Sequence, residues 1–183
     1  MLRYSSNDGY KMPIIKRGWG IKMNGKRGKT CCFTGHRDMP LDELLNIKEN
    51  LKKVLIYYIN QGYVYFGAGG ALGFDSLAAM TVLELRDQYP QIKLILVLPC
   101  KNQTRGWPKK DVEKYKWIME EADKAKYTSE HYYDGCMQAR NRHLVAYSSL
   151  CICYLTKNKG GTAYTVNYAK KNGLKVVNVG KYI

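Results

Sequence analysis

Segments of strand length alternate with helical segments from Lys29 onward, and this alternation constrains the fold more than any other feature of the sequence. Between the strand-length segments, apolar residues recur with helical spacing. Strands that alternate with helices form a parallel sheet, because each helix carries the chain back to the start of the next strand. The sequence therefore predicts an α/β fold in which a doubly wound, mainly parallel sheet of about six strands has helices on both faces. The predicted strands are 30–34, 63–66, 92–98, 125–128, 150–155 and 174–179, and the predicted helices are 42–61, 74–88, 109–124, 135–148 and 162–172.

The length and composition indicate one globular domain. A chain of 183 residues, 45% of them hydrophobic, is long enough for one core and too short for two ordinary domains. Its longest apolar run, 94–100, is far below the roughly 20 residues that span a bilayer, and residues 1–29 contain no secretory apolar region. The six cysteines form neither a CxxC pair nor a zinc-finger spacing with histidine. We therefore expect a cytoplasmic protein with buried, reduced thiols, no membrane contact, no bound metal and no cofactor.

The net charge of +15 is concentrated near the N-terminus. Residues 1–29 contain eight Lys and Arg residues and one acidic residue, so this sixth of the chain carries nearly half of the excess. Residues 1–28 also lack strand or helix periodicity and contain five glycines, which predicts a basic, flexible N-terminal extension before a domain at 29–183. Such an extension can give weak, salt-sensitive contact with nucleic acid. The moderately basic body is compatible with a pocket for an anionic small molecule.

Glycine-rich and polar segments follow the predicted strands, at the edge where doubly wound sheets bind their ligands. The stretch 67–75 opens directly into a helix, so its backbone amides could face a phosphate at the helix N-terminus. The same stretch also fits an ordinary turn. Asp75, in the first helical turn, could cap the helix or accept a hydrogen bond from a ribose hydroxyl. No GxxxxGK(S/T) segment is present, which excludes a P-loop nucleotide triphosphatase.

Further candidate residues lie after the other strands. Arg37 and Arg140 supply cations, and Gln103 supplies an amide. Trp107 and Tyr133 supply rings that can stack on a base. A second glycine and hydroxyl cluster enters the last helix, and two anion-friendly helix starts at one edge favour a phosphorylated small molecule as the ligand. The expected ligand-binding residues are Gly35, His36, Arg37, Gly69, Gly70, Gly73, Asp75, Gln103, Trp107, Tyr133, Arg140, Gly160, Gly161, Thr162 and Thr165.

Six short motifs occur in order along the chain: Thr34–Arg37, Gly70–Asp75, Leu98–Cys100, Tyr133–Met137, Arg140–Arg142 and Lys159–Thr165. As a series they closely resemble the SLOG superfamily, and its uncharacterised YpsA and YoqJ branch from Firmicutes and their phages in particular. The resemblance runs from about residue 29 to residue 179. It implies a Rossmann-like fold and the binding of a nucleotide or a nucleotide-derived ligand. Relatives differ in use: LOG-type members are phosphoribohydrolases, DprA-like members bind single-stranded DNA, and others sense signalling nucleotides.

The resemblance also bears on catalysis. LOG-type enzymes carry a Met-x-x-Arg segment and a glycine-rich segment with a catalytic glutamate; Met137 and Arg140 match the first, but Asn167 stands where the glutamate is expected. Cleavage of a glycosidic bond needs a carboxylate for acid–base chemistry or charge stabilisation. We therefore expect a binding module that senses or sequesters its ligand, with no catalytic residue assigned. The alternatives are a LOG-like nucleoside-monophosphate phosphoribohydrolase that uses Arg140 and Asp75, and DprA-like single-stranded DNA binding; homo-oligomerisation stays open.

Overall fold

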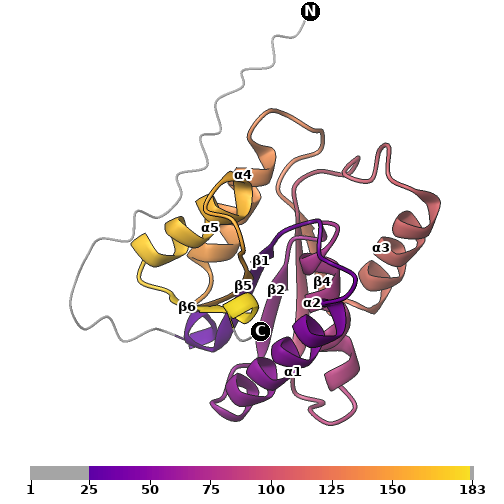
Figure 1. The fold of residues 1–183 in the computed structure, drawn as a ribbon. Coiled ribbons are helices and arrows are strands. Elements are labelled where there is room, and N and C mark those ends of the chain that lie inside the picture. The colour runs from indigo at the N-terminus through magenta and orange to yellow at the C-terminus, as the bar shows by residue number, and fades with distance from the viewer. Residues whose placement is uncertain (1–24, 182–183) are drawn as a thin grey trace, which may run out of the picture.

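The computed structural model describes residues 25–181 of the chain, and a six-stranded sheet lies at its centre (Figure 1). The strands lie in the order β4-β3-β2-β1-β5-β6, and every neighbouring pair is parallel. The predicted α/β architecture is confirmed, with a wholly parallel sheet instead of a mainly parallel one. The strands are β1 (Thr30–Gly35), β2 (Tyr65–Ala68), β3 (Lys93–Leu98), β4 (Lys124–Tyr127), β5 (Leu150–Tyr154) and β6 (Lys175–Asn178).

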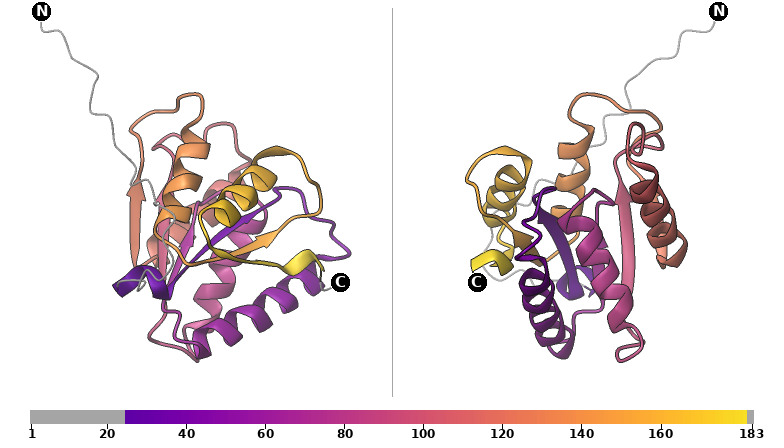
Figure 2. Two further views of the ribbon diagram at one scale, coloured as in Figure 1. Left: turned by 90° about the vertical axis from the view of Figure 1, so that its left-hand side faces the viewer. Right: turned by 45° about the vertical axis from the view of Figure 1, so that its right-hand side comes forward.

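Helices cover both faces of the sheet (Figure 2). Helices α1, α2 and α3 pack on one face, and α4 and α5 pack together on the other. Right-handed crossovers cause this division, because the chain moves outward from β1 to β4 and then returns across the sheet to β5. The α-helices of the described residues are α1 (Leu44–Asn60), α2 (Phe74–Leu85), α3 (Lys109–Glu121), α4 (Cys136–Ala146) and α5 (Gly160–Lys171).

The direction of the strand order reverses between β1 and β5. The chain leaves β1 toward β2 on one side, and it leaves β5 toward β6 on the other. The connections after these two neighbouring strands therefore separate at the carboxyl edge, which opens a crevice between them. Gly35 and Tyr154 are paired in register at this edge, so the segments that follow β1 and β5 start side by side.

The two faces of the sheet have separate apolar cores. Cys31 and Phe33 of β1 contribute to the core under α1, α2 and α3, and Cys32 contributes to the core under α4 and α5. This alternation is expected for a strand that is buried on both faces. All six cysteines are buried free thiols, as expected. Burial raises the pKa of the Cys31 thiol well above its usual value, so Cys31 is a neutral apolar side chain.

The structure places Gly67 inside β2, whereas the sequence pattern had put this glycine at the start of the phosphate-facing loop. A Cβ atom at position 67 would lie 2.9 Å from Cδ2 of Leu144 on α4. The missing side chain therefore allows α4 to pack closely on the sheet. Gly67 has a packing role that the glycine spacing of residues 67–73 did not distinguish from a ligand-facing one.

The last residues of the predicted N-terminal extension contact the domain. Residues Gly25–Lys29 form the 3-10 helix η1. Arg27 Nε donates a hydrogen bond of 3.0 Å to the Ala146 carbonyl, and Ser149 Oγ donates one of 3.3 Å to the Gly28 carbonyl. Residues 1–24 lie outside the described part of the chain. Between residues 25 and 181, no helix combines the length and the apolarity that a membrane crossing requires.

Candidate ligand site at the carboxyl edge

A cavity of about 320 Å³ lies at the carboxyl edge of the sheet, at the reversal of strand order between β1 and β5. The end of β1, the loop before α2, helix α4 and the first turn of α5 form its walls. Four segments that are far apart in sequence therefore meet at the position that the sheet topology favours for a ligand. The lining residues are Thr34, Gly35, His36, Arg37, Ala71, Asp75, Met137, Arg140, Asn141, Gly161 and Thr162.

Asp75 holds the glycine-rich loop that precedes α2. The N–H groups of Gly69 and Ala71 donate hydrogen bonds of 3.0 Å and 3.4 Å to Asp75 Oδ2. Arg140 acts on the same loop from α4, because its Nη1 donates a hydrogen bond to the carbonyl of Gly69. The amides of Gly69 and Ala71 thus bind a side chain of the protein, although the sequence had offered this loop as a phosphate cradle.

Asp75 and Arg140 are both buried, with exposed fractions of 7% and 4%, and each stabilises the other's charge. Burial raises the pKa of Asp75, while the nearby Arg140 and the two backbone N–H donors oppose the rise. Burial likewise lowers the pKa of Arg140, and Asp75 opposes the fall. Their charged groups form no direct ion pair within 4.0 Å and are linked through Gly69. A buried cation and a buried carboxylate therefore line the cavity without a direct ion pair between them.

A chain of hydrogen bonds connects Arg140 to the first turn of α5. Arg140 Nε donates to Asn141 Oδ1 at 2.7 Å, and Asn141 Nδ2 donates to Thr165 Oγ1 at 2.9 Å. Thr165 Oγ1 then donates to the carbonyl of Gly161 at 2.8 Å. This chain fixes the N-terminus of α5 relative to α4, and so fixes two walls of the cavity.

His36 connects the loop after β1 to the loop after β5. The N–H groups of Thr156 and Lys157 donate to His36 Nε2 at 3.1 Å and 3.3 Å, so this nitrogen must be unprotonated. Burial lowers the pKa of His36, and the charge of Lys157 lowers it further. The ring also makes an edge contact with Tyr154. His36 is therefore a neutral structural acceptor at neutral pH.

Arg37 and the start of α5 are the features of the cavity that suit an anion. Arg37 is exposed, and its guanidinium makes no hydrogen bond or ion pair with residues 25–181. Helix α5 begins without a hydrogen bond from a capping side chain, and Gly161 and Thr162 of its first turn line the cavity. A basic residue and the positive end of a helix dipole therefore line the same small volume.

Gly73 brings the loop before α2 against the segment after β1. Its φ of +76° is unfavourable for residues that carry a side chain, and a Cβ atom there would overlap the backbone of Arg37. The N–H of Phe74, the next residue, donates to the carbonyl of His36 at 3.1 Å. Gly73 therefore permits the close approach that forms one side of the cavity.

Seven of the expected ligand-binding residues line this cavity: Gly35, His36, Arg37, Asp75, Arg140, Gly161 and Thr162. Of the expected loop residues outside it, Gln103 is buried, and its Nε2 donates a hydrogen bond of 2.6 Å to the carbonyl of Gly70. This bond supports the loop before α2. Trp107 packs edge-on against Tyr115, and Tyr133 is 47% exposed. The other expected residues outside the lining are Gly69, Gly70, Gly73, Gly160 and Thr165.

Four lining residues were not among those expected, namely Thr34, Ala71, Met137 and Asn141. The strongest missed signal is Asn141, which stands between the two arginines of the Arg140–Arg142 motif and joins α4 to α5. Asn167, at the position of the LOG-type glutamate, is exposed on α5 and lies outside the cavity lining. Asp75 is the one carboxylate among the lining residues.

Two solved structures resemble this fold. The chain superimposes on DNA processing protein A (DprA) from Streptococcus pneumoniae with a TM-score of 0.60 and 18% identity, over 82% of this chain and 50% of that one. DprA from Helicobacter pylori, whose structure describes its single-stranded DNA binding mode, gives a TM-score of 0.57 at 18% identity, over 80% of this chain and 63% of that one. Identity at this level shows a common fold. The chain spans about half to three fifths of these longer proteins.

Sequence comparison gives closer relatives. The chain is 32% identical to the uncharacterized SPbeta prophage-derived protein YoqJ of Bacillus subtilis (strain 168) over 144 residues, which cover 72% of this chain and 84% of YoqJ. It is 28% identical over 155 residues to a UPF0398 protein of Bacillus thuringiensis (strain Al Hakam), covering 79% of this chain and 84% of that protein. Residues 31–179 match the family model described as the YspA SLOG family (YpsA). The chain therefore belongs to the YspA SLOG family.

Proposed function

We propose that the carboxyl-edge cavity binds a nucleotide or a nucleotide-derived phosphorylated small molecule, and that the protein senses or sequesters this ligand. The observation that carries the proposal is that Arg37, whose guanidinium makes no hydrogen bond or ion pair with residues 25–181, lines the same cavity as the uncapped first turn of α5. The cavity volume of about 320 Å³ lies at the lower end of the usual range for small-molecule sites, roughly 300–1,000 Å³. A single nucleotide unit is the size of ligand that this volume favours.

Each part of the lining has a distinct role in this proposal. Arg37 and the amides of the first turn of α5 bind the phosphate. Thr162 and Asn141 supply side chains that can hydrogen-bond to ribose hydroxyls. The hydrogen bonds of Asp75 and Arg140 to Gly69 hold the loop before α2 in place before the ligand arrives, which lowers the entropic cost of binding.

Binding is favoured over hydrolysis because the lining offers little acid–base chemistry. Its carboxylate, Asp75, accepts two backbone N–H groups through Oδ2, and its histidine, His36, accepts two more through Nε2. Both groups are therefore engaged in holding loops. Incubation with AMP and chromatographic detection of free adenine test this choice. Release of adenine that Arg140→Ala abolishes would establish the phosphoribohydrolase instead.

A second candidate function is DprA-like binding of single-stranded DNA. It is supported by the shared fold with two DprA structures, one of which describes a single-stranded DNA binding mode. In this case one nucleotide of the strand would occupy the same cavity, and the basic residues near the N-terminus would contact further phosphates.

Thermal-shift assays and calorimetry test the two candidates with one set of variants. The panel contains mononucleotides, ADP-ribose, cyclic dinucleotides and an oligothymidylate. We expect Arg37→Ala to abolish the shift given by a small phosphorylated ligand, while the matched control Arg105→Ala, on an exposed loop outside the cavity, retains it. If only the oligonucleotide binds, DNA binding replaces the small-molecule proposal. If no phosphate compound on the panel shifts the melting temperature, both candidates fail.

A further inference from the structure

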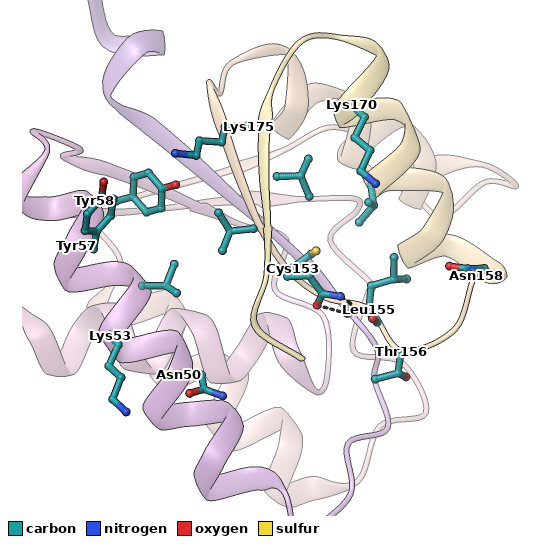
Figure 3. A pocket seen from close by; sticks show the side chains of 15 residues that line it. Asn50, Lys53, Tyr57, Tyr58, Cys153, Leu155, Thr156, Asn158, Lys170 and Lys175 are labelled. Atoms are coloured by element: carbon teal, nitrogen blue, oxygen red, sulfur yellow. Dashed lines mark hydrogen bonds between the residues drawn. The ribbon is translucent and has the colours of Figure 1, made fainter. Parts of the chain in front are cut away.

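A second and larger cavity, of about 960 Å³, lies at the opposite side of the molecule from β4, along the edge strand β6 (Figure 3). Residues of α1 form one wall and residues of α5 form the other, with β6 between them. None of its lining residues lines the carboxyl-edge cavity. It is therefore a separate site that the proposed function does not use.

The cavity has the position of a seventh strand. Within residues 25–181, β6 pairs with β5 on one side and with no strand on the other. Helices α1 and α5 lie on opposite faces of the sheet, yet both line the space around β6. In a parallel ladder, only alternate residues of a strand form backbone hydrogen bonds to a given neighbouring strand. The N–H of Lys175 donates such a bond to the carbonyl of Ser149, the residue before β5. The backbone groups of Val176 therefore turn outward, toward this space.

The side chains around β6 combine an apolar surface with cations. Val176 and Val177 are half-buried on the two faces of β6. Lys53, Lys170 and Lys175 are exposed around them, and no Asp or Glu lines the cavity. None of these three lysines belongs to an ion pair of the described residues, and Lys175 Nζ lies 5.3 Å from the centre of the Tyr58 ring.

We propose that the outer edge of β6 binds an extended, acidic segment of a partner protein as an added strand. The outward backbone groups of Val176 supply the main-chain hydrogen bonds of strand addition. Alternate apolar side chains of the segment would contact Val176 and Val177 on the two faces, as the period of a strand requires. Its carboxylates would pair with the lysines of α1, α5 and β6.

The charge of the lysines favours an acidic segment over two other occupants, a second copy of this chain and the chain's own N-terminal residues. A second copy of this chain would bring Lys175 of each copy to the same edge, and the body of the protein is itself basic. The chain's own residues 1–24 contain five basic residues and one acidic residue, so they have the same sign of charge as the lysines. A nucleic acid would satisfy the lysines but could not form a main-chain ladder with β6.

The test selects nine-residue peptides from a random phage-displayed library on the full-length protein. We expect the selected peptides to alternate β-branched residues with Asp and Glu. A synthetic copy of the best peptide should lose at least about tenfold in affinity, measured by fluorescence anisotropy, when Lys53, Lys170 and Lys175 are all changed to Glu. The control changes three exposed lysines of α3, Lys109, Lys110 and Lys116, to Glu and should retain affinity.

A second variant tests the strand geometry without altering charge. Val176→Pro removes an N–H that points away from β5, so it should leave the sheet folded and still weaken the peptide. N-methylation of alternate peptide amides should have the same effect. Selected peptides without acidic enrichment, or equal binding to the wild type and the β6-edge variants, would overturn the proposal. Two further results would overturn it. One is binding of an oligothymidylate that the same three lysine changes weaken, and the other is a dimer, detected by light scattering, that these changes dissociate.

Arg37→Ala should leave peptide binding intact, whatever it does to nucleotide binding.

Discussion

Asp75 and Arg140 bind the two polar groups of one residue, Gly69: its N–H donates to the Asp75 carboxylate, and its carbonyl accepts from the Arg140 guanidinium. Gly69 has no side chain that could separate them, and a Cβ atom there would overlap the guanidinium. One glycine in the loop before α2 is thereby held by one charge from α2 and one from α4. The loop, the two helices and the wall of the cavity depend on the same pair of buried charges.

Removal of either charge should therefore destabilise the protein. Asp75→Asn leaves the buried Arg140 without its countercharge, and Arg140→Met leaves Asp75 in the same position. Each single change should lower the free energy of unfolding by about 3 kcal/mol, measured by urea denaturation. The double variant should lose less than the sum of the two, with a coupling energy of about 1–3 kcal/mol. Losses that add to within about 0.5 kcal/mol would show that the two charges act independently.

A second prediction concerns the glycine that joins the loop before α2 to the segment after β1. Gly73→Ala must place a Cβ atom against the Arg37 backbone at a positive φ, so it should destabilise the protein by about 2–3 kcal/mol and abolish ligand binding. Gly135→Ala is the matched control, since its φ is +95° but no atom lies within 4 Å of the added Cβ. It should cost only about 1 kcal/mol and retain binding. Equal losses in the two variants would assign the effect to backbone strain alone.

The sequence predicted the fold well because the strands are short, apolar and separated by helices with clear periodicity. It also predicted the carboxyl edge as the location of a site, since that inference needs only the order of strands and helices. Arg37, Gly161 and Thr162, which line the carboxyl-edge cavity, were expected to bind a ligand for this reason. The strand order itself was not predictable, because pairing depends on contacts between residues far apart in sequence. The edge position of β6, and the cavity beside it, therefore appear only in the structure.

The roles of individual loop residues were harder to predict than their location. A carboxylate in the first turn of a helix can cap that helix, bind a ligand or hold a loop, and Asp75 holds a loop because positive φ angles at Gly70 and Gly73 turn the backbone toward it. Gln103 was a candidate on an apparently exposed loop. Its amide instead turns inward to the carbonyl of Gly70, a direction that depends on tertiary packing.

The pKa of His36 gives a prediction for pH. Because burial lowers this pKa in the folded state below the value of 6.5, the unfolded chain binds the proton more readily. Above pH 6.5 the contribution of His36 to stability is fully present, and it is lost as the pH falls through 6.5 toward the lowered pKa. Urea denaturation between about pH 8 and about pH 5 should therefore show declining stability. His36→Gln should flatten the decline but not remove it, because burial lowers the pKa of His143 in the same direction.

The basic N-terminal residues give the last prediction, in which two truncations are compared. Removal of residues 1–24 keeps η1, whereas removal of residues 1–28 also deletes the hydrogen bonds that Arg27 and Gly28 form with the domain. The shorter truncation should leave the melting temperature unchanged and weaken oligothymidylate binding. The slope of the logarithm of the binding constant against the logarithm of the salt concentration should become shallower by about 0.7 for each phosphate that the protein no longer neutralises. The longer truncation also removes Lys26 and Arg27, so it should weaken DNA binding further, and it should lower stability by about 1–2 kcal/mol. DNA binding that survives both truncations with its salt dependence intact would place the interface on the domain itself. Arg37→Ala, introduced into the truncated protein, would then test whether the carboxyl-edge cavity is that interface.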